Sequence, residues 1–184
     1  MRTTVLAVVM VTLCVMMVDA DVKPQKDFNL QRFAGRWYRL GLAYDSPSFV
    51  PFRSKLRASM GVVTALPNGN VNLTMWELTP LGCVIKVYSY EKTNLAGQFS
   101  YFSSRHNIVK DITVVDTNYS EYALVLKNKV FNREYTQVAL YGRAQTARVD
   151  VIQKFKALAL SQHFPRESIL IPPPAENCPS SRSG

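Results

Sequence analysis

The side chains with the most reactive chemistry in this chain belong to three cysteines and two histidines. His106 and His163 stand far apart, and no carboxylates accompany them at the spacing of metal ligands, so we predict neither a metal site nor a cofactor. A cysteine thiolate can act as a nucleophile, whereas two cysteines in an oxidising compartment form a disulfide. The compartment therefore decides the chemistry of Cys14, Cys83 and Cys178.

The first twenty residues, 1–20, predict a secretory signal peptide. Arg2 precedes an apolar run over 5–18, and the small residue Ala20 fits a cleavage site. The alternative is a membrane anchor, but the run is shorter than the roughly 20 residues that span a bilayer. We therefore expect a secreted, extracellular chain.

Removal of the signal peptide changes the cysteine count but not the charge. Cys14 leaves, so we expect Cys83 and Cys178 to form a disulfide that closes a loop of about 95 residues. The formal charge of +9 remains, because Arg2 and Asp19 cancel each other.

The excess positive charge has two interpretations. The secretory route disfavours nucleic acid as a partner, which leaves a solvated basic face or weak contact with anionic membranes, lipopolysaccharide or heparan chains. The cations predicted in or near loops are Arg53, Lys55, Arg57, Lys92, Arg105, Lys127, Lys129 and Arg133.

The body of the chain is a series of short segments that favour β-strands. They are separated by turn residues, of which Asn68-Gly69 is a strong hairpin signal. The eight segments cover 37–43, 56–66, 71–78, 83–91, 98–102, 108–116, 122–127 and 135–143. This spacing is typical of a sandwich or a barrel, and the hairpin connections favour an eight-stranded antiparallel up-and-down β-barrel over about 33–143.

The hydrophobic period changes after the eighth strand. Apolar residues recur every three to four positions over 146–163, which predicts one α-helix packed outside the barrel. A tail over 168–184, tethered through Cys178, completes a mostly β fold. We expect residues 21–184 to form a single domain and a monomer.

Three short motifs occupy fixed places in this plan. Gly35-x-Trp37 opens the first strand, Thr-Asn-Tyr at 117–119 follows the sixth, and Arg143 ends the eighth. In this order they resemble the motifs of the lipocalin family, and the likeness covers essentially the whole chain after residue 20. The resemblance implies a barrel with a small-molecule cavity, in which Trp37 closes one end and Arg143 lies across its indole. It gives Gly35, Trp37 and Arg143 structural roles.

Within that family the chain looks most like the lipocalin-type prostaglandin D synthases. Those isomerases use a cysteine thiolate on the second strand as nucleophile. Here Ser59 occupies the approximate position, and no register of that strand supplies a thiol. A serine needs a neighbouring base, and neither histidine is expected nearby. We therefore predict no catalytic residue. The isomerase remains the alternative function, and a basic defence protein that binds bacterial lipids is a second alternative.

A barrel of eight strands has room for one small ligand. Alternation from Trp37 points Arg39, Gly41 and Ala43 inward. The predicted ligand-binding residues are Arg39, Ser59, Leu73, Met75, Tyr88, Phe99, Tyr101, Lys110 and Tyr141. This apolar and aromatic lining with several cations predicts a lipophilic ligand with an anionic head, such as a fatty acid, retinoid, bile pigment or prostanoid. A one-residue slip in register would instead place the cations outside.

Two sequons predict glycosylation, at Asn72 and at Asn118. Asn72 alternates with the inward-facing Leu73, so we expect its side chain on the outer face of the barrel.

Overall fold

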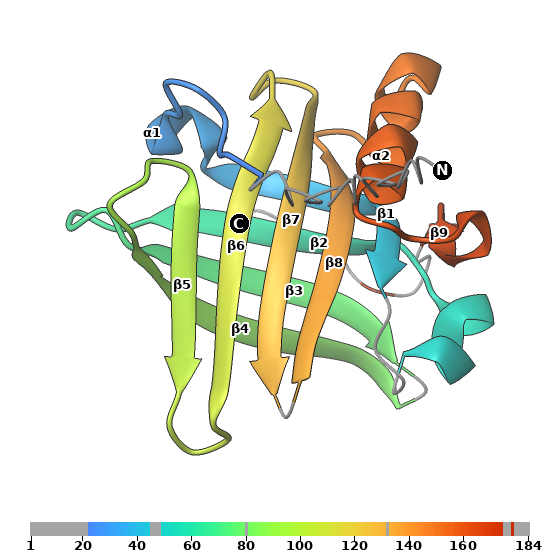
Figure 1. Ribbon diagram of the computed structural model, residues 1–184, viewed down its shortest axis with the longest axis horizontal. Coiled ribbons are helices and arrows are strands. Elements are labelled where there is room, and N and C mark those ends of the chain that lie inside the picture. The colour runs from blue at the N-terminus through green and yellow to red at the C-terminus, as the bar shows by residue number, and fades with distance from the viewer. Residues whose placement is uncertain (1–21, 45–48, 80, 132, 175–177, 179–184) are drawn as a thin grey trace, which may run out of the picture.

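The computed structural model describes residues 22–44, 49–79, 81–131, 133–174 and 178. Eight antiparallel strands form a closed barrel (Figure 1), and this confirms the predicted fold. They are β1 (Gly35–Tyr44), β2 (Ser59–Ala65), β3 (Val71–Thr79), β4 (Gly82–Lys92), β5 (Gln98–Ser103), β6 (Ile108–Thr117), β7 (Tyr122–Phe131) and β8 (Arg133–Gly142). Each strand pairs with the next, and β1 closes the barrel by pairing with both β8 and β2. The predicted signal peptide lies outside the described residues.

One helix of more than three turns, α2 (Val149–Ser161), packs outside the barrel against β1 and β8, as predicted (Figure 1). Its apolar stripe of Val151, Phe155 and Ala159 is buried against the barrel wall. The helix is shorter than the predicted 146–163. It ends early because His163 adopts a left-handed backbone with φ of 63°, which a continuing helix does not allow.

Shorter elements close or border the ends of the barrel. The helical turn α1 (Leu30–Phe33) crosses one end, and the 3-10 helix η1 (Val50–Lys55) lies beside the other (Figure 1). η1 was not predicted, and β2 begins at Ser59 rather than at 56. A second 3-10 turn, η2 (Arg166–Ser168), leads into the short strand β9 (Ile169–Leu170).

The C-terminal segment is fastened to the barrel at three places. β9 pairs with β1, the backbone N–H of Ala58 donates to the carbonyl of Pro173 at 2.8 Å, and Cys178 forms a disulfide with Cys83 at the start of β4. The predicted disulfide is therefore confirmed, and it spans 95 residues of sequence.

Strand β1 contains a break in its alternation. Its pairing with β8 shifts between Arg39 and Gly41, so that Leu42 rather than Gly41 returns to the interior. Gly41 and Ala43 face α2 instead. The prediction that both point inward is wrong, because a β-bulge inserts one extra residue and reverses the direction of the side chains that follow.

Candidate ligand-binding cavity

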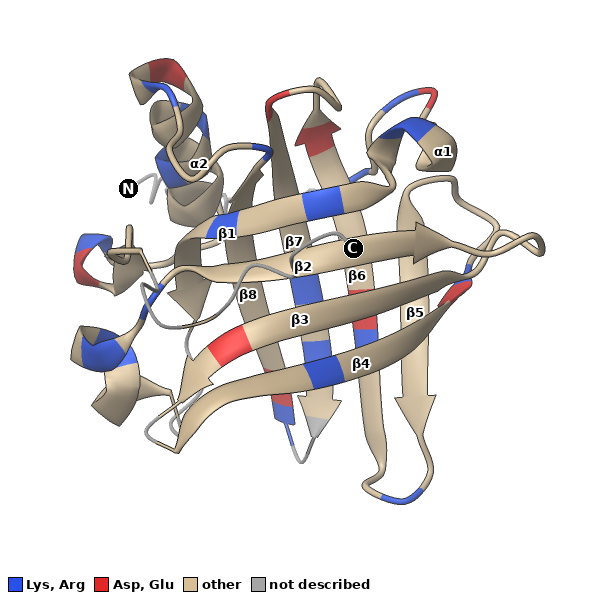
Figure 2. Cartoon of the chain, turned by 180° about the vertical axis from the view of Figure 1, so that it is seen from behind, with Lys and Arg blue, Asp and Glu red and all other residues tan. Residues whose placement is uncertain are grey.

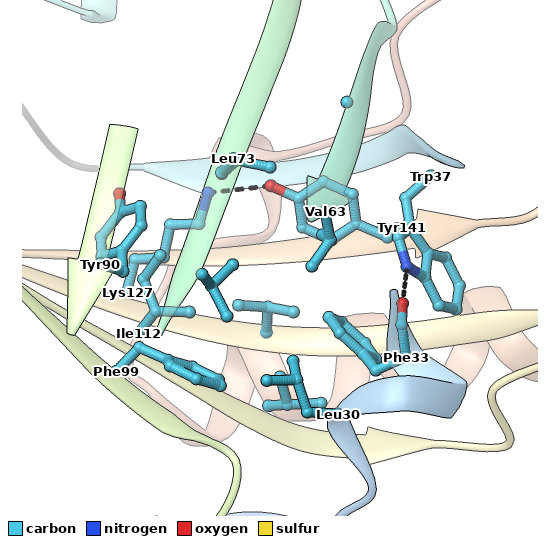
Figure 3. Close-up of a pocket in the computed structure, with 14 residues that line it drawn as sticks. Leu30, Phe33, Trp37, Val63, Leu73, Tyr90, Phe99, Ile112, Lys127 and Tyr141 are labelled. Carbon is cyan, nitrogen blue, oxygen red and sulfur yellow. Dashed lines mark hydrogen bonds between the residues drawn. The ribbon is translucent and has the colours of Figure 1, made fainter. Parts of the chain in front are cut away.

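The barrel interior contains an apolar chamber of about 60 Å³ at the end covered by α1 (Figure 3). Its lining consists of Leu30, Phe33, Trp37, Gly61, Val63, Val71, Leu73, Tyr90, Phe99, Ile112, Val114, Val125, Lys127 and Tyr141. Apart from Lys127, every one of these side chains is apolar or aromatic. The chamber is therefore suited to hydrocarbon rather than to a charged group.

A second, charged chamber of about 310 Å³ lies towards the end of the barrel where β7 turns into β8. Its lining consists of Arg39, Tyr44, Leu73, Met75, Glu77, Lys86, Tyr88, Tyr90, Lys110, Ile112, Lys127, Asn128, Lys129, Tyr135 and Gln137. Leu73, Tyr90, Ile112 and Lys127 line both chambers, so the two are parts of one cavity. A mouth groove of about 510 Å³ continues from it to η1 and includes Ser59.

The floor of the apolar chamber is built by Trp37 and Arg143. The indole N–H of Trp37 donates to the carbonyl of Phe33 at 2.8 Å, and the Arg143 guanidinium carbon lies 3.7 Å from the centre of the indole. The guanidinium also donates to the carbonyls of Tyr119, Arg36, Arg32, Phe33 and Ala34, at 2.7–3.2 Å. This network ties α1, the turn after β6 and the end of β8 together, so we expect ligand entry at the opposite end.

Among the described residues that line the charged chamber, the single carboxylate is that of Glu77 on β3, which lies between two cations. Figure 2 shows an acidic segment on β3 and basic segments on the strands β1 and β4. The Glu77 oxygens are 3.3 Å from an Arg39 nitrogen and 2.9 Å from Lys86 Nζ. Burial alone would raise the pKa of Glu77, but the positive charges of Arg39 and Lys86 outweigh burial and lower that pKa. The hydrogen bond from Lys86 to Glu77 raises the pKa of Lys86. Glu77 and Lys86 are therefore both charged at neutral pH.

Lys110 on β6 lies against the faces of two tyrosines. Its Nζ is 4.4 Å from the ring centre of Tyr88 and 5.3 Å from that of Tyr101, and these two rings meet edge to face. Burial, and after it the nearby charges of Lys129 and Lys127, lower the pKa of Lys110 to about 8. This amine consequently loses its charge closer to physiological pH than an ordinary lysine does.

Lys127 stands where the two chambers meet, and its Nζ donates to the hydroxyl of Tyr141 at 2.9 Å (Figure 3). The prediction that Lys127 and Lys129 lie in or near loops, on an exposed basic surface, is wrong. β7 runs on to Phe131, so both lysines lie within the strand and line the charged chamber. Continued alternation from the inward-facing Val125 could have found them.

The structure brings the predicted ligand-binding residues together around one interior. Arg39, Leu73, Met75, Tyr88, Phe99, Lys110 and Tyr141 line the two chambers, Tyr101 packs on Tyr88 and Tyr90, and Ser59 lines the mouth groove. Besides the two lysines, three polar lining residues were not predicted. Asn128 lies beyond the predicted seventh strand, whereas Tyr135 and Gln137 lie within the predicted eighth strand and alternate with the same period as Tyr141.

Ser59 is buried, and its hydroxyl has no hydrogen-bond partner among the described residues. No base activates it in this arrangement. His106 contacts Ser103 at 3.3 Å in the β5–β6 turn. Within the described ranges, no group of three or more His, Cys, Asp or Glu side chains is arranged to hold a metal ion.

No helix in the described part of the chain is both long and apolar enough to cross a membrane. The profile of the lipocalin / cytosolic fatty-acid binding protein family matches residues 34–176. The chain is 33% identical to a protein named Lipocalin from Rhinella marina, over 98% of this chain and 99% of that one. It is 32% identical to the prostaglandin-H2 D-isomerase of Canis lupus familiaris, over 87% of this chain and 85% of that one.

Solved structures show the same architecture. Lipocalin 12 from rat epididymis superposes with a TM-score of 0.73 at 25% identity, covering 82% of this chain and 88% of that one. The siderocalin Ex-FABP superposes with a TM-score of 0.72 at 24% identity, covering 80% and 97%. The barrel, its helix and the match over residues 34–176 lead to one conclusion: the chain belongs to the lipocalin family.

Proposed function

We propose that this lipocalin is a secreted protein that binds and carries a small hydrophobic ligand with an anionic head in its barrel cavity. The observation that supports this proposal is the division of the interior into an apolar and a charged chamber. A hydrocarbon chain in the apolar chamber would leave water, at about 25 cal/mol for each Å² buried. The head of the same molecule would then lie in the charged chamber.

The balance of charge in the charged chamber favours an anion. Among the described residues, its cations include Arg39, Lys86, Lys110 and Lys127, and Glu77 is its carboxylate. One carboxylate cannot neutralise four cations, and a buried charge is costly without a partner. A ligand carboxylate would supply that partner, and each charge-assisted hydrogen bond contributes about 1.5–3 kcal/mol. Fatty acids, retinoic acid, bile pigments and prostanoids share this chemistry.

The proposal includes the secretory route and the processing that it implies. Residues 1–20 would be removed, and residues 21–184 would act as a monomeric, single-domain carrier. Of the two sequons, we favour Asn72 for glycosylation, because the amide oxygen of Asn118 accepts backbone hydrogen bonds from Glu121 and Tyr122 and holds a turn.

Titration with a fluorescent fatty acid tests the proposal. The double variant Arg39→Ala with Lys110→Ala removes two cavity cations, and Arg148→Ala with Lys156→Ala removes two exposed cations as a control. We expect the cavity variant to bind the fatty acid at least about tenfold more weakly than the unmodified protein does. A fluorescent alcohol of the same chain length carries no charge, and we expect its binding to weaken less than about threefold. Absence of saturable binding by the unmodified protein, or equal affinities of the two double variants, would contradict the proposal.

A prostaglandin isomerase is the second candidate, because one of the similar proteins is named prostaglandin-H2 D-isomerase. Both cysteines among the described residues are joined in the disulfide, and Ser59 lacks a neighbouring base. We therefore rank this function below carriage. Turnover of the endoperoxide substrate above its uncatalysed decay, abolished by Ser59→Ala, would reverse that order.

A further inference from the structure

Lys110 differs from the other cavity cations in the kind of partner that it contacts. Lys86 is paired with the carboxylate of Glu77, and Lys127 donates to a tyrosine hydroxyl. Lys110 instead lies over the faces of Tyr88 and Tyr101, and among the described residues no carboxylate forms an ion pair with it.

The environment of Lys110 increases the neutral fraction of its amine relative to that of an ordinary lysine. The charged and titratable groups around it are Glu77 from β3, Lys86 and Tyr88 from β4, Tyr101 from β5, and Lys127 and Lys129 from β7. Burial and the surrounding cations lower its pKa to about 8, so about 20% of the amine is neutral at pH 7.4. The neutral fraction of an ordinary lysine at that pH is about 0.1%. Only the neutral amine carries the lone pair that attacks an electrophile.

Lys110 lies in the charged chamber, on the same strand as residues that line the apolar chamber. Lys110, Ile112 and Val114 lie on the inward face of β6, and Ile112 lines both chambers while Val114 lines the apolar one. Four residues of strand separate Lys110 from Val114, a distance of about 13 Å. An alkyl chain whose tail lies in the apolar chamber and which continues into the charged chamber alongside these residues therefore brings its terminal carbon to the Lys110 amine.

We propose that Lys110 captures lipophilic aldehydes inside the cavity by forming a covalent imine. This inference rests on the proposed binding of a hydrophobic chain in the apolar chamber. The neutral Nζ attacks the aldehyde carbon and a C–N bond forms. The carbonyl oxygen leaves as water with the two hydrogens of the amine, so that R–NH₂ and O=CH–R′ give R–N=CH–R′ and H₂O. No oxidant or reductant takes part.

The cavity also favours the product over free solution. An imine is uncharged, so the burial and the neighbouring cations that disfavour the charged amine do not disfavour the imine. The hydrocarbon tail holds the aldehyde beside the amine, which replaces a bimolecular encounter with a positioned one. Exposed lysines such as Lys156 on α2 offer neither advantage.

The test uses decanal as the aldehyde and cyanoborohydride to reduce the imine to a stable secondary amine at pH 7.4. Intact mass measurement counts the adducts, and peptide mapping locates them and separates Lys110 from the α-amino group of the chain. We expect one dominant adduct at Lys110, formed at least about tenfold faster than at Lys156 in the same sample, and blocked by excess decanoate.

The matched variant is Lys110→Arg, which keeps the positive charge but cannot form an imine. We expect this variant to lose the adduct, whereas Lys156→Arg, which changes an exposed lysine on α2, should form the Lys110 adduct at the unmodified rate. Adducts spread evenly over exposed lysines, or an unchanged adduct in Lys110→Arg, would overturn the inference. Fatty acid binding without a Lys110 adduct would refute the inference alone, whereas an adduct at Lys110 without fatty acid binding would refute only the proposed carrier function.

Discussion

Replacement of Glu77 by glutamine is expected to strengthen binding of an anionic ligand and to weaken the fold. Glu77 contacts Arg39 and Lys86, the two cations that a ligand carboxylate would contact from their other side. Glutamine keeps the size of the side chain and removes only its charge. The substitution therefore separates the contribution of charge from that of shape.

The expected gain in affinity follows from the distances between Glu77 and its two cations. The Glu77 oxygens lie 3.3 Å from Arg39 and 2.9 Å from Lys86, so a ligand carboxylate on the far side of either cation would be about 6 Å from Glu77. Two negative charges at that distance repel by about 3 kcal/mol at an effective dielectric constant of 20, and by about 0.7 kcal/mol in water. Removal of the repulsion tightens binding by between about 3-fold and about 100-fold, and we expect about tenfold.

The same substitution leaves the neighbouring cations without their carboxylate. Breaking a fully buried pair costs about 3–5 kcal/mol, but the side chain of Lys86 is 48% exposed, so we expect a loss of about 1–2 kcal/mol in the free energy of unfolding. The folded-state pKa of Glu77 is lowered, so its contribution to stability is present at neutral pH and disappears as the pH falls and the carboxylate is protonated. The difference between the two proteins should therefore shrink towards zero below about pH 4.

The assay combines fatty acid titration with urea unfolding of the unmodified protein and Glu77→Gln. Glu121→Gln is the control, because Glu121 is an exposed carboxylate that pairs with Arg148 outside the cavity. A fluorescent alcohol of the same chain length reports any change in shape. Unchanged affinity for the acid in Glu77→Gln, or an equal gain for the alcohol, would refute the reasoning that Glu77 competes with the ligand head.

Three further predictions concern the floor, the outer helix and pH. Arg143→Lys should lower the free energy of unfolding by about 2–4 kcal/mol in urea, because lysine cannot reproduce five hydrogen bonds and the contact with Trp37. Gly41→Ala should lower it by about 1–3 kcal/mol, because the new Cβ would lie 2.8 Å from the ring of Phe155. Affinity for a fatty acid should fall by up to about tenfold between pH 7 and 9, as Lys110 loses its proton with a pKa of about 8.

Each of these three predictions has its own control. Arg148→Lys changes an exposed arginine and should leave stability within about 0.5 kcal/mol. If Arg143→Lys were equally mild, the floor network would not hold the barrel together. A Gly41→Ala protein with an unchanged unfolding midpoint would show that α2 moves away at no cost. For the pH dependence, Lys110→Arg should keep its affinity for the fatty acid up to pH 9. If that affinity declined as much in the variant as in the unmodified protein, a group other than Lys110 would cause the pH dependence.

Much of the cavity could be predicted from the sequence because a strand alternates its side chains with a period of two. Leu73 and Met75 on β3, and Tyr88 on β4, follow from that rule alone once the strands are located. The rule requires correct strand ends, however, and the predicted seventh strand stopped at 127. Lys127 and Lys129 were assigned to the surface because charged residues usually lie there.

The bulge in β1 and the charge pairing of Glu77 could not be predicted in this way. A bulge depends on how two strands pair, and the residue types around Gly41 do not predict one. The close approach of Glu77 to Lys86 depends on the β3–β4 register, which pairs Met75 with Lys86 across the two strands. Local patterns describe one strand at a time, whereas both features arise between strands.

The interior cations are unfavourable for stability, and this is the strongest physical reason to connect them with a ligand. Apolar side chains of similar volume would fill the barrel without the cost of desolvating charges. Glu77 offsets part of the repulsion. The charges of Arg39 and Lys86 outweigh burial and lower the pKa of Glu77, while burial, and after it the charges of Lys129 and Lys127, lower the pKa of Lys110. A ligand anion would relieve the same repulsion that Glu77 relieves only in part. Ligand binding should consequently raise the unfolding midpoint more in Glu77→Gln than in the unmodified protein. An equal rise in both proteins would show that the interior cations do not take part in ligand recognition.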